Sequence, residues 1–146
     1  MSKALYTAEA HVTGGRTEGH GRTADGMLEV DLRLPRQMGG DGGGTNPEEL
    51  FAVGYAACFE GALGTVARRS KLEAGDVAID SKVSLITTEE RAFTVSVELH
   101  VSLPSIEDDA AAVELVRAAH KVCPYSNATR GNIDVLLTAN GQAVEH

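Results

Sequence analysis

The chain has 146 residues, of which 42% are hydrophobic, and a formal net charge of −8. This length predicts one domain, residues 1–146, that buries a core without disulfide bonds. The negative charge argues against nucleic acid and anionic membranes as partners, because both bind basic surfaces. No apolar leader follows Met1, so we expect a cytoplasmic protein, in which a structural disulfide would be unusual.

The first third of the chain predicts three strands joined by glycine-rich turns. Loose alternation indicates a strand over residues 5–13, and a short returning strand over 20–23 follows the turn that carries Arg16. Residues 28–34 alternate apolar with charged side chains, which is typical of a strand with one wet face. A glycine run at 39–44 follows, and the absence of Gly-Lys-Ser or Gly-Lys-Thr after it excludes a P-loop.

A long apolar helix is predicted from Pro47 to about Ser70. Asn46 can cap this helix, and Glu48 and Glu49 complement the positive end of its dipole. A glutamate and several glycines interrupt its apolar run, which falls short of the roughly 20 apolar residues that a bilayer requires. We therefore expect a helix buried on most sides within a globular protein.

The second half predicts a hairpin, a helix and a last strand. Residues 77–85 and 93–103 alternate apolar with polar side chains, as antiparallel partners do. A helix that stops at Pro124 precedes a strand over 133–139, and residues 140–146 are expected to form a loose tail. The order β-β-β-α-β-β-α-β indicates an α+β fold with a mainly antiparallel sheet. One small sheet cannot cover the apolar first helix, so we expect a second copy of the chain, in a homodimer, to cover the rest.

Cys58 and Cys123 are the only cysteines of the chain. Each could be inert, because a buried cysteine behaves as a small hydrophobe. Two thiols also permit a redox cycle, in which one attacks an oxidant as a thiolate and the other resolves the sulfenic acid as a disulfide. The position of Cys123 beside a proline at a helix end favours it as the resolving thiol. Because 65 residues separate the two, only the fold can bring them together.

An attacking thiol in an apolar helix needs a cation nearby. Burial among Ala and Phe raises the pKa of a thiol and suppresses its reactivity. Arginine suits this task because its guanidinium stays charged when dehydrated, and Arg16 on the glycine-rich turn is the best candidate. The other candidates are Arg22, Arg68 and Arg130. A buried arginine needs an anion, which Glu48 or Glu49 could supply, although both could serve the helix dipole alone.

Two other kinds of function remain open. A metal site could combine Cys58, Cys123 and His120 with one further ligand, but no Cys-x-x-Cys pair supports it. A thiol redox sensor without turnover, or a small-molecule-binding module, could use the same two cysteines. A sensor usually carries an output surface such as a basic DNA-binding helix, and the sequence has none.

Two longer segments carry a more specific signal. Residues 45–59 read Thr-Asn-Pro-Glu-Glu-Leu-Phe-Ala-Val-Gly-Tyr-Ala-Ala-Cys-Phe, and residues 122–133 read Val-Cys-Pro-Tyr-Ser-Asn-Ala-Thr-Arg-Gly-Asn-Ile. These segments resemble the two cysteine motifs of the organic hydroperoxide resistance proteins, the Ohr branch of the OsmC/Ohr family. The resemblance extends over residues 6–137, and its small departures are Glu49 and Val53.

The resemblance implies a thiol-dependent peroxidase that reduces organic and fatty-acid hydroperoxides. It implies Cys58 as the peroxidatic thiolate, Cys123 as the resolving thiol, Arg16 as the catalytic arginine and Glu48 as the carboxylate that orients it. Such proteins are intertwined α+β homodimers with sites at the subunit interface. They hold no bound cofactor and are recycled by dihydrolipoamide on lipoylated proteins. The apolar side chains expected to line the substrate pocket are Phe51, Tyr55 and Phe59.

Overall fold

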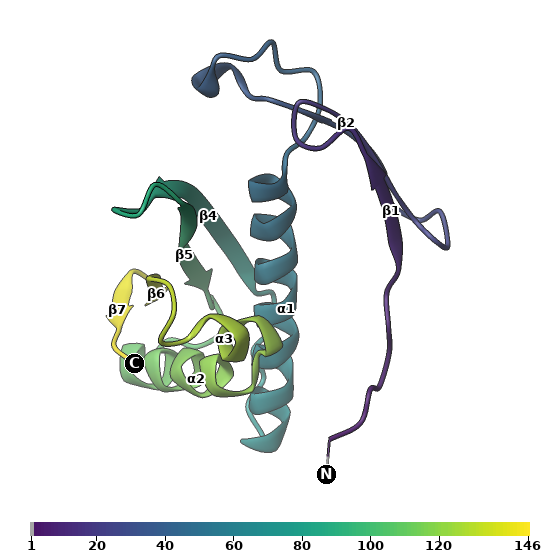
Figure 1. The fold of residues 1–146 in the computed structure, drawn as a ribbon. Coiled ribbons are helices and arrows are strands. Elements are labelled where there is room, and N and C mark those ends of the chain that lie inside the picture. The colour runs from purple at the N-terminus through teal and green to yellow at the C-terminus, as the bar shows by residue number, and fades with distance from the viewer. Residues whose placement is uncertain (1) are drawn as a thin grey trace. The chain divides into compact units, whose positions relative to one another are not determined.

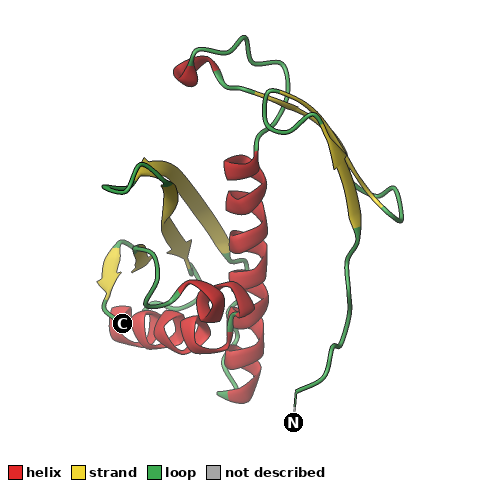
Figure 2. Cartoon of the chain, in the orientation of Figure 1, coloured by secondary structure: helices red, strands yellow, loops and turns green. Residues whose placement is uncertain are grey.

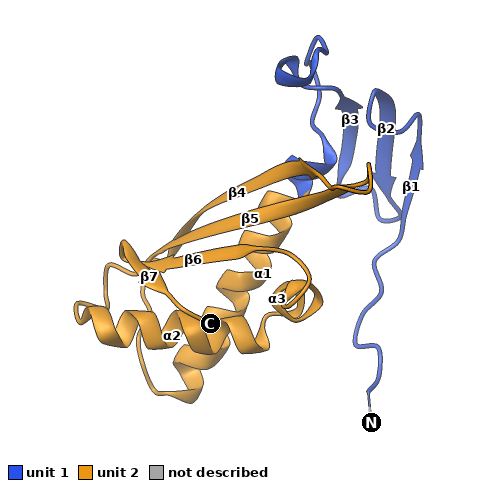
Figure 3. Cartoon of the chain, turned by 60° about the vertical axis from the view of Figure 1, so that its left-hand side comes forward, with its two compact units in different colours: residues 1–50 blue, residues 51–146 orange. Residues whose placement is uncertain are grey.

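The computed structural model describes residues 2–146, which form two compact units, residues 2–50 and 51–146 (Figure 3). Helix α1, Pro47–Arg69, begins in the first unit and continues into the second. Each unit contains its own sheet, with strand order β1-β2-β3 in the first and β4-β5-β6-β7 in the second. Helices and strands together confirm the predicted α+β class (Figure 2).

The N-terminal unit is an antiparallel sheet followed by a glycine-rich loop (Figure 1). Its elements are β1 (Ala10–Thr13), β2 (Glu18–Thr23), β3 (Glu29–Arg33) and the 3-10 helix η1 (Arg36–Met38). The strand predicted over residues 5–13 starts only at Ala10, because Ala10 pairs with Thr23, the last residue of β2. Asn46 caps α1 as predicted, since its Oδ1 accepts the Glu49 N–H at 2.8 Å.

The C-terminal unit combines a four-stranded sheet with helices. Its further elements are β4 (Ala78–Thr87), β5 (Phe93–Ser102), α2 (Asp109–Val122), α3 (Pro124–Thr129), β6 (Val135–Ala139) and β7 (Gln142–Val144). Strands β4 and β5 form the predicted antiparallel hairpin, β6 pairs with β5 in parallel, and β7 returns antiparallel to β6. The sheet is therefore mainly antiparallel, with one parallel pair.

The core of this unit lies between α1, α2 and one face of the sheet (Figure 3). Alternation along β5 turns Val97, Leu99 and Val101 inward, each at most 2% exposed. Tyr55, Phe59 and Leu63 from α1 and Leu115, Val116 and Ala119 from α2 complete the packing. Each such side chain, fully buried, contributes about 1.5–3 kcal/mol of apolar transfer free energy.

Helix α1 is more apolar than the sequence interpretation allowed. Its 23 residues, with a mean hydropathy of 1.5 over 18 of them, suffice by length and composition to cross a membrane. The expectation that it falls short was therefore wrong. The core helix of a globular protein passes the same test, and α1 packs its buried side chains into the core of the C-terminal unit.

Residues 140–146 do not form the expected loose tail. Asn140 and Gly141 have φ angles of 48° and 83° and turn the chain from β6 into β7. Two residues with positive φ match the right-handed twist of a hairpin, and Asn-Gly is the pair that adopts them most readily. Val144 is 5% exposed, and the Arg117 Nε–H donates to the Glu145 carbonyl at 2.9 Å. Packing and hydrogen bonds thus hold the end of the chain.

Candidate active site

The two cysteines of the chain lie in contact within the C-terminal unit. Cys123 Sγ is 3.6 Å from Cys58 Sγ, and both are free thiols. A disulfide would place the sulfurs about 2.05 Å apart, so the pair is reduced but adjacent. Cys123 is fully buried, whereas Cys58 is partly exposed. The fold therefore joins the thiols that the sequence separates, and leaves Cys58 as the more accessible of the two.

Cys123 occupies the junction between two helices. It ends α2, with its N–H donating to the Ala119 carbonyl at 2.9 Å, and it precedes α3, with its carbonyl accepting the Asn127 N–H at 2.9 Å. Pro124 stops α2 as predicted, but it also begins α3, because proline suits the first position of a helix. Two helix ends thus fix the position of the buried sulfur.

The surroundings of Cys58 favour its neutral form. Burial is the largest cause that raises the pKa of this thiol, and the neighbouring Cys123 raises it further. The backbone N–H of Tyr125, at the start of α3, donates to the sulfur and acts in the opposite direction. Within its own unit, none of the groups that shift the pKa of Cys58 is a cation. The thiol is positioned but not activated by the C-terminal unit alone.

Arg16 and Glu48 form a two-pronged ion pair within the N-terminal unit. Arg16 Nη1 and Nη2 donate to the two carboxylate oxygens of Glu48 at 3.1 and 3.0 Å. The turn before Arg16 requires glycine, because Gly14 has a φ of 77° and a Cβ there would lie 2.1 Å from the Glu18 carbonyl oxygen. This geometry is the planar fork that arginine makes with carboxylates.

The structure separates the roles of the two glutamates. The hydrogen bond to Glu48 raises the pKa of Arg16, and the same bond lowers the pKa of Glu48. Both groups are therefore charged at neutral pH. The Glu49 carboxylate instead accepts the Thr45 hydroxyl at 2.8 Å. Of the two candidate anions, Glu48 is the one that holds Arg16.

The other arginines named as candidates have local partners. Arg22 Nε lies 3.8 Å from a Glu29 oxygen, and Arg68 Nη2 lies 3.4 Å from the Thr65 hydroxyl. Arg130 bonds to Asn127 Oδ1 at 2.9 Å and to the His120 carbonyl. None of these arginines forms a two-pronged bond like that of Arg16 to Glu48.

Three aromatic rings pack together between α1, which carries Cys58, and α3, which follows Cys123. Phe51 stacks on Tyr125 with ring centroids 5.7 Å apart and planes 17° apart, and Tyr55 meets both rings at an angle. Tyr55 and Phe59 are fully buried, whereas Phe51 is partly exposed and Tyr125 is 39% exposed. Of the three side chains expected to line a pocket, only Phe51 presents ring surface in this chain. Tyr125 adds a ring that the sequence interpretation missed.

Two further polar groups were also missed. The Tyr55 hydroxyl lies 2.8 Å from Ser126 Oγ and 3.2 Å from Thr129 Oγ1, and all three residues are buried. Ser126 and Thr129 both belong to α3, directly after Cys123. Their position inside the second cysteine motif was the only available signal, and it did not reveal their partner.

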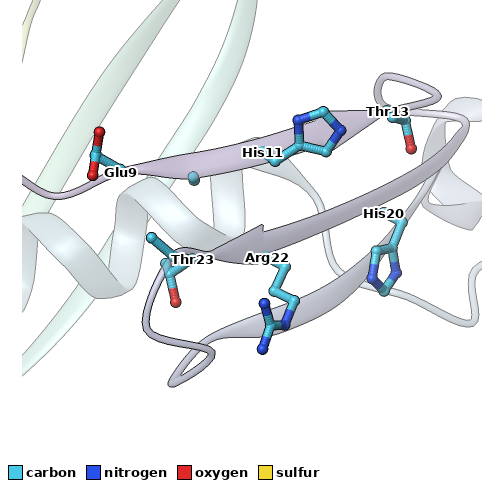
Figure 4. A pocket seen from close by; sticks show the side chains of 8 residues that line it. Glu9, His11, Thr13, His20, Arg22 and Thr23 are labelled. Carbon is cyan, nitrogen blue, oxygen red and sulfur yellow. The ribbon is translucent and has the colours of Figure 1, made fainter.

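A separate group of ionisable side chains lies on the N-terminal sheet and contains no thiol. A hollow of about 430 Å³ on the β1–β2 face is lined by His11, His20 and Arg22 among others (Figure 4). His20 is held there by Glu29 at 2.8 Å and Asp31 at 3.0 Å. Within residues 2–146, no group of three His, Cys, Asp or Glu side chains is arranged to hold a metal ion.

Known proteins resemble this chain over nearly its whole length. The sequence pattern of the family described as OsmC-like protein matches residues 40–138. The organic hydroperoxide resistance protein of Xanthomonas axonopodis pv. citri (strain 306) is 54% identical, over 93% of this chain and 95% of that protein.

Solved structures agree with the sequence comparison. The structure of an organic hydroperoxide resistance protein from Legionella pneumophila superposes with a TM-score of 0.88 at 52% identity, covering 93% of this chain and 98% of that one. The structure of OhrB from Bacillus subtilis gives 0.84 at 47% identity, covering 92% and 98%. The chain belongs to the OsmC/Ohr family, among the organic hydroperoxide resistance proteins.

Proposed function

We propose that this protein is a thiol-dependent peroxidase that reduces organic and fatty-acid hydroperoxides to alcohols. The observation that carries the proposal is the 3.6 Å contact between a partly exposed thiol, Cys58, and a buried one, Cys123. This is the arrangement that an attacking and a resolving thiol require. The names of its relatives support the substrate class, since several are organic hydroperoxide resistance proteins.

In the proposed cycle, the Cys58 thiolate attacks the distal oxygen of the hydroperoxide. The O–O bond breaks, the alkoxide takes up a proton and leaves as the alcohol, and Cys58 becomes a sulfenic acid. The Cys123 sulfur then attacks the Cys58 sulfur, forming the disulfide and releasing water. An external dithiol reduces the disulfide in two exchange steps and leaves as its own cyclic disulfide.

Arg16 supplies the charge that the thiol lacks. Because burial raises the pKa of Cys58, attack requires a cation that favours the thiolate. In this proposal the Arg16 guanidinium, kept charged and oriented by Glu48, takes this role. It also stabilises the negative charge that develops on the leaving alkoxide. The backbone N–H of Tyr125 donates to the Cys58 sulfur and also favours the thiolate.

Apolar side chains select the substrate in this proposal. Phe51 and Tyr125 present ring surface to the hydroperoxide tail, and Tyr55 and Phe59 form the buried support behind them. Each CH₂ group of the tail that leaves water contributes about 0.8 kcal/mol, so long-chain hydroperoxides are favoured over hydrogen peroxide.

A second copy of the chain is part of the proposed enzyme. Val53 on α1 is 72% exposed, Phe93 is 69% exposed and Leu136 is 50% exposed, and a second copy of the chain would cover such large apolar side chains. We expect a homodimer, and a monomer in sedimentation analysis at micromolar concentration would contradict it. The proposed reductant is dihydrolipoamide on a lipoylated protein, and the proposed location is the cytoplasm.

Steady-state consumption of cumene hydroperoxide with dihydrolipoamide tests the proposal. The wild-type protein should turn over, Cys58→Ser should lose turnover, and Cys123→Ser should react once but fail to recycle through the disulfide. Turnover by Cys58→Ser would remove the proposed nucleophile. A wild-type protein that is oxidised once and then not reduced by any dithiol would instead be a redox sensor.

A further inference from the structure

Two contacts, equally spaced along the chain, join α1 to the segment that carries Cys123. Cys58 Sγ meets Cys123 Sγ at 3.6 Å, and the Tyr55 hydroxyl meets Ser126 Oγ at 2.8 Å. Tyr55 precedes Cys58 by three residues, and Ser126 follows Cys123 by three. Residues three apart on a helix share a face, so the hydroxyl contact lies about one turn from the sulfur contact.

The hydroxyl contact is a closed hydrogen-bond network. Tyr55 also lies 3.2 Å from Thr129 Oγ1, and Thr129 Oγ1 lies 3.4 Å from the Ser126 carbonyl oxygen. All protons can be placed together if Ser126 donates to Tyr55, Tyr55 donates to Thr129, and Thr129 donates to the Ser126 carbonyl. Tyr55 and Ser126 are fully buried, so no water can replace a lost partner without opening the core.

Disulfide formation must bring the two sulfurs closer together. The sulfurs start 3.6 Å apart, and a disulfide requires about 2.05 Å together with a specific torsion. The Cys123 carbonyl is bonded to the Asn127 N–H within the first turn of α3, so the cysteine and this turn are connected. A contact that holds the turn against α1 therefore controls how close the second sulfur remains to the first.

We infer that Tyr55 is a positioning residue for the resolving step, acting through Ser126 and Thr129 to hold Cys123 beside the Cys58 sulfenic acid. This inference rests on the proposed peroxidase cycle and adds a role that Tyr55 plays without touching the hydroperoxide. Tyr55 governs the second step, in which the Cys123 sulfur attacks the Cys58 sulfur, the S–S bond forms and water leaves. The first step, peroxide attack by Cys58, depends less on the Tyr55 hydroxyl, because the ring alone packs against Phe51 and Tyr125.

Single-turnover experiments on Tyr55→Phe test the inference, because this change removes the hydroxyl and keeps the ring. The protein is mixed with one equivalent of cumene hydroperoxide without reductant, and free thiols, dimedone-trapped sulfenic acid and disulfide are counted by mass spectrometry over time. The variant removes two hydrogen bonds, and we expect disulfide formation to slow at least about three- to tenfold, the factor that the loss of one such bond predicts. The trapped sulfenic acid should rise, and excess hydroperoxide should convert more of Cys58 to sulfinic acid.

Three variants separate positioning from general destabilisation. Peroxide attack measured in Cys123→Ser should slow less than disulfide formation does when Tyr55→Phe is added, because the variant keeps the ring that packs against Phe51 and Tyr125. Ser126→Ala should slow disulfide formation as Tyr55→Phe does, and the double variant should be no slower than either. Ser81→Ala is the matched control, because Ser81 Oγ is a buried hydroxyl with no hydrogen-bond partner among residues 2–146 and belongs to the same unit.

The outcomes also separate this inference from the proposed function. If the wild-type protein forms no Cys58–Cys123 disulfide with the hydroperoxide, the proposed cycle itself fails. If the wild type forms it and both Tyr55→Phe and Ser126→Ala close it at the same rate, only the positioning role is overturned. A matching slowdown of peroxide attack would also overturn it, because Tyr55 would then act on Cys58. If Tyr55→Phe does not fold, Ser126→Ala decides the question alone.

Discussion

The two units of this protein have opposite effects on the ionisable side chains whose pKa values they shift. In the N-terminal unit, contacts raise the pKa of Arg16 and His20 and lower the pKa of Asp25, Asp31 and Glu48, so each charged form is favoured. In the C-terminal unit, burial raises the pKa of Tyr55 and Cys58 and lowers the pKa of His120, so each neutral form is favoured.

The difference explains why a reactive thiol needs help from outside its own unit. In the C-terminal unit, packing holds two thiols and a tyrosine hydroxyl in contact with their partners. The same burial disfavours the charged form of any ionisable group. The N-terminal unit prepares a charged arginine, with a carboxylate that keeps it oriented. In the proposed mechanism, the Arg16 charge favours the thiolate that the C-terminal unit alone disfavours.

The largest effect that tests this comparison concerns His120. This side chain is 2% exposed, both ring nitrogens lack partners among residues 2–146, and burial lowers its pKa from 6.5 to about 4. His146, 4.3 Å away between ring centroids, and Arg130 are the smaller causes of this same shift. Between pH 6.5 and 4, His120 is therefore protonated in the unfolded chain but neutral in the folded chain. The free energy of unfolding falls as pH falls through this window.

Urea unfolding at pH 7.5 and pH 5, at fixed protein concentration, measures this contribution. We expect the His120 contribution to the free energy of unfolding to fall by about 2 kcal/mol between the two, at about 1.4 kcal/mol per pKa unit. His120→Gln should remove that part of the pH dependence, whatever its effect at pH 7.5. His11→Gln, at an exposed position, is the control and should leave the slope intact. Equal slopes in wild type and His120→Gln would show that the core accepts the charge.

An effect of comparable size is expected from removing the charge that the N-terminal unit supplies. Arg16→Ala should lower the rate constant of Cys58 with cumene hydroperoxide about 10- to 100-fold, since a hydrogen bond to a charged group is worth roughly 1.5–3 kcal/mol. The rate should be measured at neutral pH in Cys123→Ser, where only the first step occurs. The pH dependence of alkylation by iodoacetamide should move to higher pH in Arg16→Ala, because the thiolate loses its cation.

The matched variants define what Arg16 does. Arg16→Lys keeps a positive charge but cannot form the two-pronged bond to Glu48, so it should recover only part of the rate. Arg22→Ala removes an arginine from the adjoining strand and should change nothing. If Arg16→Ala remains slow at a pH where the thiol is fully ionised, Arg16 also stabilises the transition state. Unchanged reactivity at every pH would exclude Arg16 from the mechanism.

Local patterns predicted most of the fold. The Asn46 cap, the start of α1 at Pro47 and the β4–β5 hairpin follow from short-range chemistry that the structure confirms. Two errors were errors of interpretation, because the sequence carried the signal. Pro124 was taken only as a stop, although proline also starts helices, and Asn140-Gly141 after an alternating strand predicts a hairpin rather than a loose tail.

Local patterns could not supply the contacts of the site. Residue chemistry alone offered Glu48 and Glu49 equally as partners of Arg16, and only the family resemblance indicated Glu48. Neighbouring helical residues point about 100° apart, and the packed turn selects Glu48. The 3.6 Å sulfur contact and the Tyr55–Ser126 bond join residues 65 and 71 positions apart. Such contacts depend on how helices pack, which no spacing in the sequence encodes.

The smallest effect concerns His20, which represents the charge-favouring behaviour of the N-terminal unit. Its Nδ1 lies 3.0 Å from Asp31 and its Nε2 lies 2.8 Å from Glu29, and only an imidazolium can donate through both nitrogens. Asp31 is the larger and Glu29 the next cause of its raised pKa. Titration followed by NMR should therefore place the His20 pKa above the ordinary 6.5, and Asp31→Asn should lower it more than Glu29→Gln does. Asp41→Asn, which removes a carboxylate from the glycine-rich loop, is the control.

Salt should distinguish the two histidines and so the two units. His20 is exposed, and ions screen interactions between exposed charges, so adding about 1 M NaCl should bring its pKa back toward the ordinary value. The pKa of His120 is lowered mainly by burial, which salt does not screen, and it should stay low. The two histidines also have opposite effects on the pH dependence of stability. The raised pKa of His20 stabilises the fold below pH 6.5, and this contribution is lost as pH rises through the pKa of the folded state. If the pKa values of His20 and His120 respond alike to salt, burial is not what distinguishes the ionisable groups of the two units.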